Sequence, residues 1–247
     1  MDRLIYVAMT GARESMRAQS VVSHNIANAG TIGFRALQHS LQSAPVPGWG
    51  FPSRINAVSE PNLVDTSTGV MISTGRNLDI AIRGQGWLAV QAPDGEEAYT
   101  RGGNLRVTPE GMLETANGHL VLGNGGPISL PPYQKLAIGG DGQISIVPQG
   151  QKPDTIADVD RLKLVKPDSA DLKPLGDGLF RLKDGEPPAA DPSVLIANGQ
   201  LETSNVNPAQ ALVQMIELSR HYEMQVRAMH NAEQNDQAAA RLMRMNG

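Results

Sequence analysis

The middle of the chain contains carboxylates that could serve general acid and base chemistry. They are Asp79, Asp94, Glu96, Glu97, Glu110 and Glu114. Paired carboxylates on a β framework catalyse glycoside hydrolysis in other proteins. Asp94 precedes Gly95, however, and an Asp-Gly pair supplies the geometry of a tight turn. We therefore interpret these acids as turn and surface residues rather than as a catalytic pair.

The histidines are scattered along the chain. They are His24, His39, His119, His221 and His230. None has another histidine three or four residues away, as a helical zinc site would require. The absence of cysteine excludes thiolate ligands, disulfides and a cysteine nucleophile. The sequence also lacks the Gly-x-Ser-x-Gly elbow of many hydrolases, so we predict neither a metal site nor an enzyme.

Two glycines resemble the start of a dinucleotide-binding loop. Gly84-Gln85-Gly86 precedes the strand-like segment Trp87-Leu88-Ala89-Val90, whereas a dinucleotide-binding loop opens a helix and carries a third glycine. There is also no phosphate loop of the form Gly-x-x-x-x-Gly-Lys-Ser/Thr. A strand-entry turn is the simpler interpretation, and we expect no cofactor.

The overall charge limits the possible partners. With 21 basic and 25 acidic residues, the formal net charge of −4 offers no extended positive surface for nucleic acid.

Residues 1–10 lack the pattern of a secretory signal peptide. No window approaches the ~20 apolar residues that a membrane helix requires. We therefore expect no membrane insertion and, if the chain is exported, a route without a cleaved signal.

The first long segment that could position other groups is a proline-free stretch from Leu4 to about Asn28. Its apolar and small residues recur in steps of four and three, at Leu4, Ala8, Gly11, Ser15, Ala18 and Val22. A second row follows beside it, at Ile5, Met9, Ala12 and Met16. Two adjoining rows predict a helix that contacts more than one partner helix. The alternative is a helix that packs only on the core of its own domain.

The last segment predicts a longer helix. No glycine or proline interrupts residues 209–246, which would span about 57 Å as a helix. The predicted buried stripe is Leu212, Met215, Ser219, Tyr222, Val226, Met229, Glu233, Asp236, Ala240 and Met243. Glu233 and Asp236 would be costly to bury as unpaired charges, so we expect that turn to be solvated or paired.

The region between the helices has a different character. Residues 43–74 are rich in Pro, Gly, Ser and Thr and predict an extended connector. Beyond them the polarity alternates with a period of two, and Asp-Gly or Asn-Gly pairs recur, such as Asp94-Gly95, Asp141-Gly142 and Asp184-Gly185. These pairs favour tight hairpin turns. The middle is therefore predicted to be an antiparallel all-β unit.

Together these patterns predict an α+β fold in which the N- and C-terminal helices pair as a coiled-coil module with an inserted antiparallel all-β domain. The expected boundaries are 1–42 for the first helix and its following motif, 43–74 for the connector, 75–202 for the β domain and 203–247 for the last helix. Aromatic residues make up only 4% of the chain, so packing must depend on aliphatic residues and methionine.

Two motifs after the first helix resemble the flagellar rod and hook family. They are Ser23-His24-Asn25-Ile26-Ala27-Asn28-Ala29 and Thr31-Ile32-Gly33-Phe34-Arg35. Further segments agree, including Leu78–Trp87, Tyr99–Leu105 and Ser204-Asn205-Val206-Asn207. The opening residues 1–12 look like the proximal rod form of the family. His24 departs from the family pattern, since an asparagine is common there.

The resemblance implies a non-enzymatic structural subunit with no cofactor. It implies export through the flagellar type III apparatus without signal cleavage and assembly in the periplasm into the basal-body rod, which transmits torque. The implied partners are other rod proteins, further copies of the chain, the export apparatus and the periplasmic ring around the rod. The expected subunit interface is Leu4, Ala8, Gly11, Val22, Asn25, Asn28, Gly33, Phe34, Leu212, Met215, Tyr222, Val226, Met229 and Met243.

Two other interpretations stay open at this point. The chain could be a distal rod or hook subunit of the same family. It could also be a secreted glycan-active β domain that oligomerises through its helices, although three Phe, two Trp and four Tyr provide few aromatic rings for sugar stacking.

Overall fold

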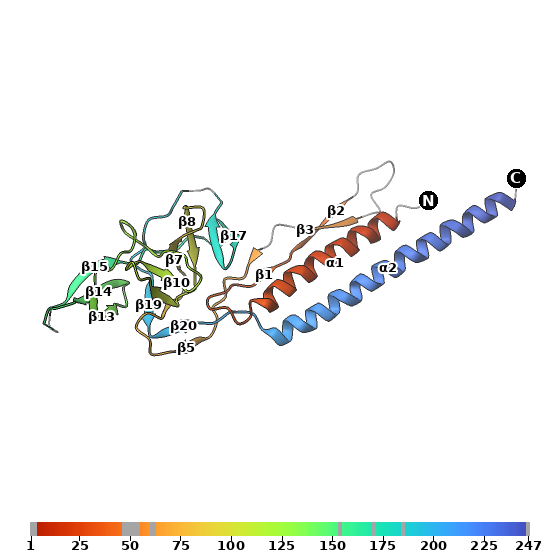
Figure 1. The fold of residues 1–247 in the computed structure, drawn as a ribbon. Helices are drawn as coiled ribbons and strands as arrows, with labels where there is room; N and C mark the ends of the chain where they lie inside the picture. Colours follow the sequence, from red (N-terminus) through yellow and green to blue (C-terminus); the bar gives the residue numbers. More distant parts are fainter. Residues whose placement is uncertain are drawn as a thin grey trace. The chain divides into compact units, whose positions relative to one another are not determined.

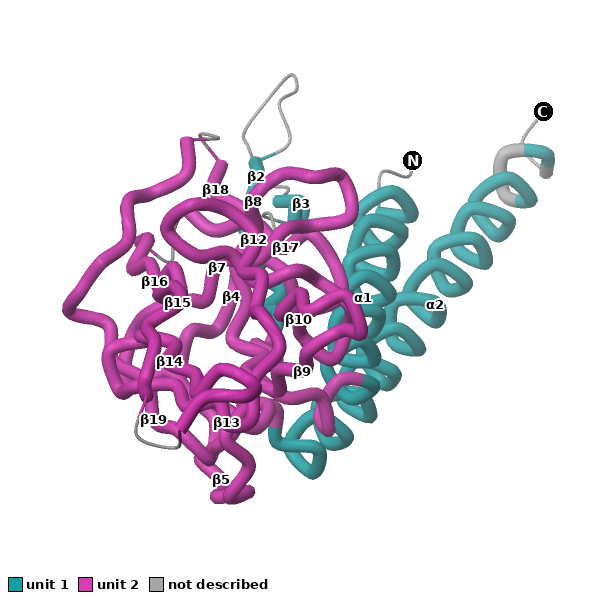
Figure 2. The backbone as a smooth tube through the Cα atoms, turned by 60° about the vertical axis from the view of Figure 1, so that its left-hand side comes forward, with its two compact units in different colours: residues 1–27, 37–63, 207–247 teal, residues 28–36, 64–206 magenta. Residues whose placement is uncertain are grey.

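The computed structural model describes residues 4–45, 55–59, 63–152, 155–168, 171–183 and 186–245. The chain forms two compact units. Unit 1 contains residues 1–27, 37–63 and 207–247, and unit 2 contains residues 28–36 and 64–206 (Figure 2). Neither of the described helices combines the length and the apolar run that crossing a bilayer requires.

Two helices dominate unit 1. Helix α1 runs from Leu4 to Ala27 and helix α2 from Pro208 to Met245. They lie side by side in opposite directions, so that residues near the two chain termini lie at the same end of the pair (Figure 1). The side chain of Asn207 caps α2 by accepting the N–H groups of Ala209 (3.0 Å) and Gln210 (3.3 Å), and Pro208 occupies the first turn.

Unit 1 also contains a β hairpin. Strand β2 (Leu41–Pro45) pairs with β3 (Ile55–Ser59), and β3 contacts α1. Much of the segment that the sequence analysis treats as an extended connector, residues 43–74, is therefore paired in strands. Its alternation of polarity is weak because β2 and β3 bury few of their side chains, which leaves the sequence without a clear period of two.

Unit 2 is built from short antiparallel strands. A five-stranded sheet has the order β16-β7-β8-β18-β17 and a three-stranded sheet the order β13-β14-β15. The strands of these sheets are β7 (Trp87–Gln91), β8 (Glu97–Thr100), β13 (Tyr133–Ile138), β14 (Gln143–Pro148), β15 (Ala157–Arg161), β16 (Leu164–Val165), β17 (Leu172–Gly176) and β18 (Leu179–Leu182). This confirms the predicted antiparallel middle.

Shorter pairs complete unit 2. They are β5 (Met71–Ser73) with β20 (Gln200–Glu202), β6 (Ile80–Arg83) with β19 (Leu195–Asn198), β9 (Leu105–Val107) with β10 (Leu113–Thr115), and β11 (Leu122–Gly123) with β12 (Gly126–Pro127). Two further strands have two residues each: β1 (Leu37–Gln38) belongs to unit 1, and β4 (Leu63–Val64) lies where the ranges of the two units meet.

The predicted turn dipeptides connect neighbouring strands. Asp94-Gly95 joins β7 to β8, and Asp141-Gly142 joins β13 to β14. Gly95 and Gly142 have φ angles of 88° and 84°, a conformation that side-chain-bearing residues rarely adopt. The predicted pair Asp184-Gly185 lies outside the described residues.

The core of unit 2 consists of two groups of buried side chains. The larger group is aliphatic and includes Ile80, Leu88, Leu113 and Ile144, each no more than 1% exposed. The smaller group centres on Trp87 and Phe180, whose rings lie 4.8 Å apart in a tilted arrangement. The scarcity of aromatic residues is thus offset by aliphatic packing, as the composition predicts.

Candidate assembly surfaces

The face of α2 that packs on α1 is formed by small and flexible residues. The buried or half-buried residues of α2 among those described are Ser219, Ala228, Ala239 and Ala240, together with a row formed by Ala211, Met215, Leu218, Gln225, Met229 and Ala232. Their steps of four, three and seven are those of a heptad pattern, with Tyr222 between Leu218 and Gln225. A Cβ added to Gly11 of α1 would lie 2.9 Å from Cδ of Gln225, so glycine permits close approach of the helices here.

This buried face differs by one residue from the predicted stripe at alternate positions. Met215, Ser219, Met229 and Ala240 of the predicted stripe are half-buried, but Leu212 is 52% exposed while Ala211 is buried. Likewise Glu233 is exposed and Ala232 is only 1% exposed. The shift has a physical reason, because it buries an alanine instead of a carboxylate and keeps the charge in water. The expectation that the turn with Glu233 is solvated is therefore confirmed.

Large apolar side chains remain exposed on both helices. On α1 they are Tyr6, Met9 and Met16, and on α2 they are Leu212, Val213, Ile216 and Met224. Each is about half exposed or more. Exposed apolar groups gathered along one element indicate an interaction surface more strongly than isolated ones do. Val226 and Tyr222, two predicted interface residues, are also partly exposed.

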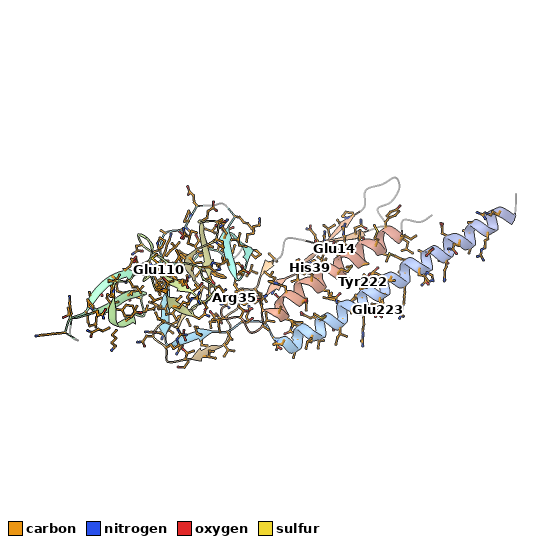
Figure 3. The ribbon with its side chains drawn as sticks, in the orientation of Figure 1. Glu14, Arg35, His39, Glu110, Tyr222 and Glu223 are labelled. Atoms are coloured by element: carbon orange, nitrogen blue, oxygen red, sulfur yellow. The ribbon has the colours of Figure 1, made fainter. Side chains whose placement is uncertain are left out.

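Helix α1 also carries a buried carboxylate. Glu14 is 2% exposed, and Arg17 Nη1 donates to its Oε1 at 3.0 Å. The same Arg17 nitrogen donates to Ser59 Oγ of β3 at 3.0 Å. His39 Nε2 lies 3.9 Å from Glu14 Oε2, and both residues are labelled in Figure 3. Glu14 therefore links α1 to the segment that follows the helix, a role that its sequence position does not predict.

The end of α1 is held by Asn25. Its side-chain amide donates to the Leu37 carbonyl at 2.8 Å and accepts the Leu37 N–H at 2.9 Å. Asn28 begins the following turn, where its carbonyl accepts the Thr31 N–H at 3.1 Å. These two predicted interface residues thus define how the chain leaves the helix.

Gly33 and Phe34 lie in the interior of unit 2. Gly33 has a φ angle of 69°, and a Cβ there would lie 2.2 Å from the backbone carbon of Arg101. Its N–H donates to the carbonyl of Glu202 at 2.8 Å, and Phe34 is 4% exposed. The motif Gly-Phe therefore has a structural explanation within one subunit, and a contact of these residues with a neighbour stays a prediction.

A buried ion network lies next to this motif. Arg35 and Glu202 have fully buried side chains, and Arg35 Nη2 donates to Glu202 Oε1 at 2.6 Å (Figure 3 labels Arg35). Arg101 Nη1 donates to Glu202 Oε2 at 2.9 Å, and the Gly69 N–H donates to Oε1 at 2.9 Å. Burial lowers the pKa of Arg101, while the charge of Glu202 opposes that shift.

The sequence contains two of these three charged residues in its quoted motifs. Arg35 closes the Gly-Phe-Arg motif, and Arg101 lies in the segment Tyr99–Leu105. Glu202 was missed because it lies two residues before the Ser204-Asn205 motif and has no partner nearby in sequence. Charges this far apart in the chain give no pairing signal in a single sequence.

The carboxylates considered first for catalysis are engaged with basic residues. Arg181 pairs with Asp94 and Glu96, Lys163 with Glu97, and Arg106 with Glu114. Asp79 accepts the Thr74 hydroxyl at 2.7 Å, and Glu110 is exposed. Within the described residues, no group of three or more His, Asp or Glu side chains is arranged to hold a metal ion.

Of the remaining predicted interface residues, Ala8 and Val22 are buried in α1, and Gly11 is half-buried. Leu4 is half exposed at the start of the helix. The side chain of Met243 lies outside the described part of the structure. The structure therefore brings the helical members of the set into unit 1 and leaves Gly33 and Phe34 in unit 2.

Three family models match separate parts of the chain. The model for the flagella basal body rod protein matches residues 5–35, which include α1 and the Gly-Phe-Arg motif. The D1 domain of the flagellar hook protein FlgE/F/G matches residues 81–146. The C-terminal model of the flagellar basal body rod FlgEFG proteins matches residues 197–242, which include most of α2.

Individual relatives match over the full length. The flagellar basal-body rod protein FlgF of Salmonella typhimurium is 42% identical over 251 residues, covering 99% of this chain and 100% of the relative. FlgF of Escherichia coli is 40% identical with the same coverage. A FlgG rod protein of Buchnera aphidicola is 30% identical, covering 96% of this chain and 98% of the relative. The chain belongs to the flagellar basal-body rod protein family and is FlgF-like within it.

Proposed function

We propose that this chain is a structural subunit of the proximal part of the bacterial flagellar rod and that it joins the rod through its terminal helices. The observation that carries the proposal is the row of exposed apolar residues on a helix pair that is already packed on its inner side. Burying such a row on a neighbouring subunit contributes about 25 cal/mol for each Å² of apolar surface covered, which offsets the entropic cost of association.

The pairing of α1 and α2 as a coiled coil is part of this proposal. The heptad-like spacing of the buried side of α2 supports it, as does the small side chain at Gly11 opposite Gln225. In an assembled rod, the exposed rows would meet the corresponding helices of neighbouring subunits. Head-to-tail contacts of this kind extend into a helical array instead of closing.

The partners that follow from this function are other rod proteins and copies of this chain. We propose that the rod subunit is exported by the flagellar type III apparatus without signal cleavage, resides in the periplasm and meets the ring around the rod. It transmits torque for motility and has no catalytic activity. The pairing of the carboxylates of unit 2 with arginine and lysine supports the last point, since ion-paired acids on turns are poor proton donors.

A distal rod or hook subunit of the same family is the second candidate. The identity of 42% and 40% to two FlgF proteins, against 30% to a FlgG protein, favours the proximal rod. A secreted glycan-active domain gains little support, because Trp87 and Tyr99 are buried in the core of unit 2 and present no ring to a sugar.

The direct test is to locate the protein in the organelle. A tagged copy is expressed in a motile strain, hook and basal-body complexes are purified, and the tag is located by immunoblot and electron microscopy. Tag density in the proximal rod supports the proposal. Density in the distal rod or hook favours the second candidate, and absence of the tag from the complexes of motile cells whose only copy of the protein is tagged contradicts both.

The helix surface is tested by substitutions on the same helix. Leu212→Asp and Val226→Asp place a charge on the exposed row, and Gln214→Asp is the matched control at an exposed polar position. The first two variants should fold normally, as measured by circular dichroism, but should be lost from purified basal bodies and abolish motility. Normal motility of both variants would show that this surface is not needed for assembly.

A further inference from the structure

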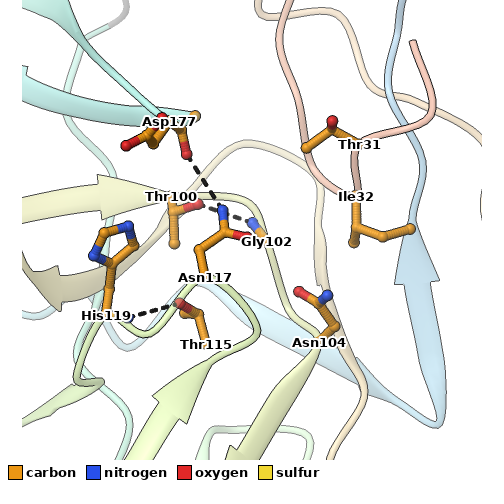
Figure 4. Close-up of a pocket in the computed structure, with 10 residues that line it drawn as sticks. Thr31, Ile32, Thr100, Gly102, Asn104, Thr115, Asn117, His119 and Asp177 are labelled. Atoms are coloured by element: carbon orange, nitrogen blue, oxygen red, sulfur yellow. Dashed lines mark hydrogen bonds between the residues drawn. The ribbon is translucent and has the colours of Figure 1, made fainter. Parts of the chain in front are cut away.

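Unit 2 contains a small polar pocket beside the rod motif. Its volume is about 40 Å³, and it is lined by side chains of the loop 28–36, the loop after β8 and the turn before His119 (Figure 4). The polar residues around it include Thr31, Thr100, Asn104, Asn117 and His119. Asp177 and Gly178, in the turn between β17 and β18, also line it, so the pocket brings together four segments of the chain.

His119 is the residue in this pocket that most needs a partner. His119 is only 8% exposed, and its Nε2 has no hydrogen-bond partner among the described residues. The His119 backbone N–H is engaged, since it donates to Thr115 Oγ1 at 3.2 Å. A neutral imidazole offers one donor and one acceptor nitrogen, and a buried polar atom is normally hydrogen-bonded.

The other walls offer complementary groups. Thr100 Oγ1 accepts the Gly102 N–H at 3.0 Å, which leaves the hydroxyl hydrogen of Thr100 available to an acceptor. The side-chain amide of Asn104 faces the same space, and Asn117 Nδ2 makes only a long contact of 3.5 Å with the Asp177 carbonyl (Figure 4). An amide presents both donors and an acceptor. The pocket is therefore surrounded by both hydrogen-bond donors and hydrogen-bond acceptors.

These features match the requirements of an ordered water site. A cavity of about 10–15 Å³ on the same measure holds one water, and a buried water makes about three hydrogen bonds to otherwise unsatisfied groups. The volume of about 40 Å³ is sufficient for one or two waters and too small for an organic ligand.

We propose that this pocket binds ordered water and that the bound water joins His119 to the loop after β8, at Thr100 and Asn104. The water accepts from or donates to His119 Nε2 according to the tautomer and completes its bonds with Thr100 and Asn104. The inference concerns unit 2 alone and does not depend on the rod assignment.

The first test is a high-resolution crystal structure of the full chain. The expected result is electron density for a water within hydrogen-bond distance of His119 Nε2 and of Thr100 Oγ1 or the Asn104 side chain. Density restricted to open solvent, or a pocket closed by direct contacts of His119, would overturn the proposal whether or not any variant folds.

The second test uses His119→Leu, whose effect on Tm is expected to have opposite signs in a hydrated and in a dry pocket. If the water is bound, His119→Leu removes one of its partners and should lower the Tm of unit 2 by roughly 2–4 °C, whereas His119→Gln retains a polar group and should change it less. If the pocket is dry, His119→Leu removes an unsatisfied buried nitrogen and should leave Tm unchanged or raise it. His221→Leu, at an exposed position of α2, controls for the exchange of residue type.

Discussion

The two units of this protein are stabilised in different ways. Unit 2 has a closed interior, with aliphatic residues such as Leu113 and Ile144 in its core and the buried network of Arg35, Glu202 and Arg101 beside the motif loop. Unit 1 is a helix pair whose inner face is small, with Ala211 and Ala232, and whose outer faces keep large apolar residues in contact with water. Unit 2 buries its large apolar side chains within itself, whereas unit 1 leaves several of its own exposed, and we propose that neighbouring subunits cover them.

This difference shows where each kind of sequence motif acts. The Gly-Phe-Arg motif serves the interior of unit 2, because Gly33, Phe34 and Arg35 are all buried there. The outer apolar residues of α2 are about half exposed in the single subunit, and we propose that they act in association. Changes to the motif should therefore unfold unit 2, and changes to the outer face of α2 should act on assembly.

The largest effect is expected for Glu202→Gln. The substitution leaves the buried guanidinium groups of Arg35 and Arg101 without a compensating charge, which costs about 3–5 kcal/mol when one partner of a buried ion pair is removed. Chemical denaturation of a Trp49→Phe background, followed by the fluorescence of Trp87, measures the free energy of unfolding of unit 2. Glu114→Gln, which removes a more exposed pair with Arg106, is the control and should cost less than about 1 kcal/mol. Equal costs would contradict a special role of the buried network.

The next effect concerns the backbone of the motif loop. Gly33→Ala forces a side chain into a left-handed conformation and places a Cβ 2.2 Å from the carbon of Arg101, so we expect a loss of about 2–4 kcal/mol. Gly30→Ala is the matched control, because a Cβ at Gly30 meets no atom within 4 Å. Hydrogen exchange should show faster exchange of unit 2 amides in the first variant and no change in the second. Similar exchange in both would show that the loop can move away at little cost.

A third pair of substitutions separates the two faces of α2. Ala232→Asp buries a charge on the side that packs on α1 and should destabilise unit 1 by about 2–3 kcal/mol. Val213→Asp adds the same charge on the exposed side and should change the stability of the free subunit by less than about 0.5 kcal/mol. Loss of helical circular dichroism on heating measures both. If Val213→Asp proves as destabilising as Ala232→Asp, the outer face is already covered within one subunit.

Much of the architecture follows from local patterns in the sequence. The Asp-Gly pairs mark hairpins, and the absence of proline from residues 4–28 and 209–246 marks the helices, because both signals depend on neighbouring residues. The buried side of α2 could be assigned only to within one residue. Leu212 and Ala211 are both apolar, and the choice between them depends on packing against α1 and on keeping Glu233 in water.

The buried charges and the polar pocket could not be predicted in this way. Glu14 lies on a helix beside two arginines and looks like a solvated surface residue, and its burial depends on His39 and Ser59, which come later in the chain. His119 follows an Asn-Gly turn, which usually places a residue at the surface. In each case the environment is created by residues distant in sequence.

The smallest effect is a pH dependence of the turn between β7 and β8. The hydrogen bond from Arg181 (2.6 Å), and then the Glu96 N–H, lower the pKa of the Asp94 carboxyl below its ordinary value. A carboxyl with a lowered pKa in the folded state stabilises that state above the ordinary pKa, and the contribution disappears as the pH falls through the lowered value.

Wild type should therefore have a slightly higher Tm than Asp94→Asn at pH 7, and the difference should shrink as the pH falls below about 4. Asp94 is about half exposed, so solvent screening keeps the difference small, well below that of Glu202→Gln. Paired melting curves across this pH range measure it. A Tm difference that grows as the pH falls would contradict the direction of the pKa shift. A Tm difference at pH 7 as large as that of Glu202→Gln would mean that this exposed pair stabilises unit 2 as much as the buried network does.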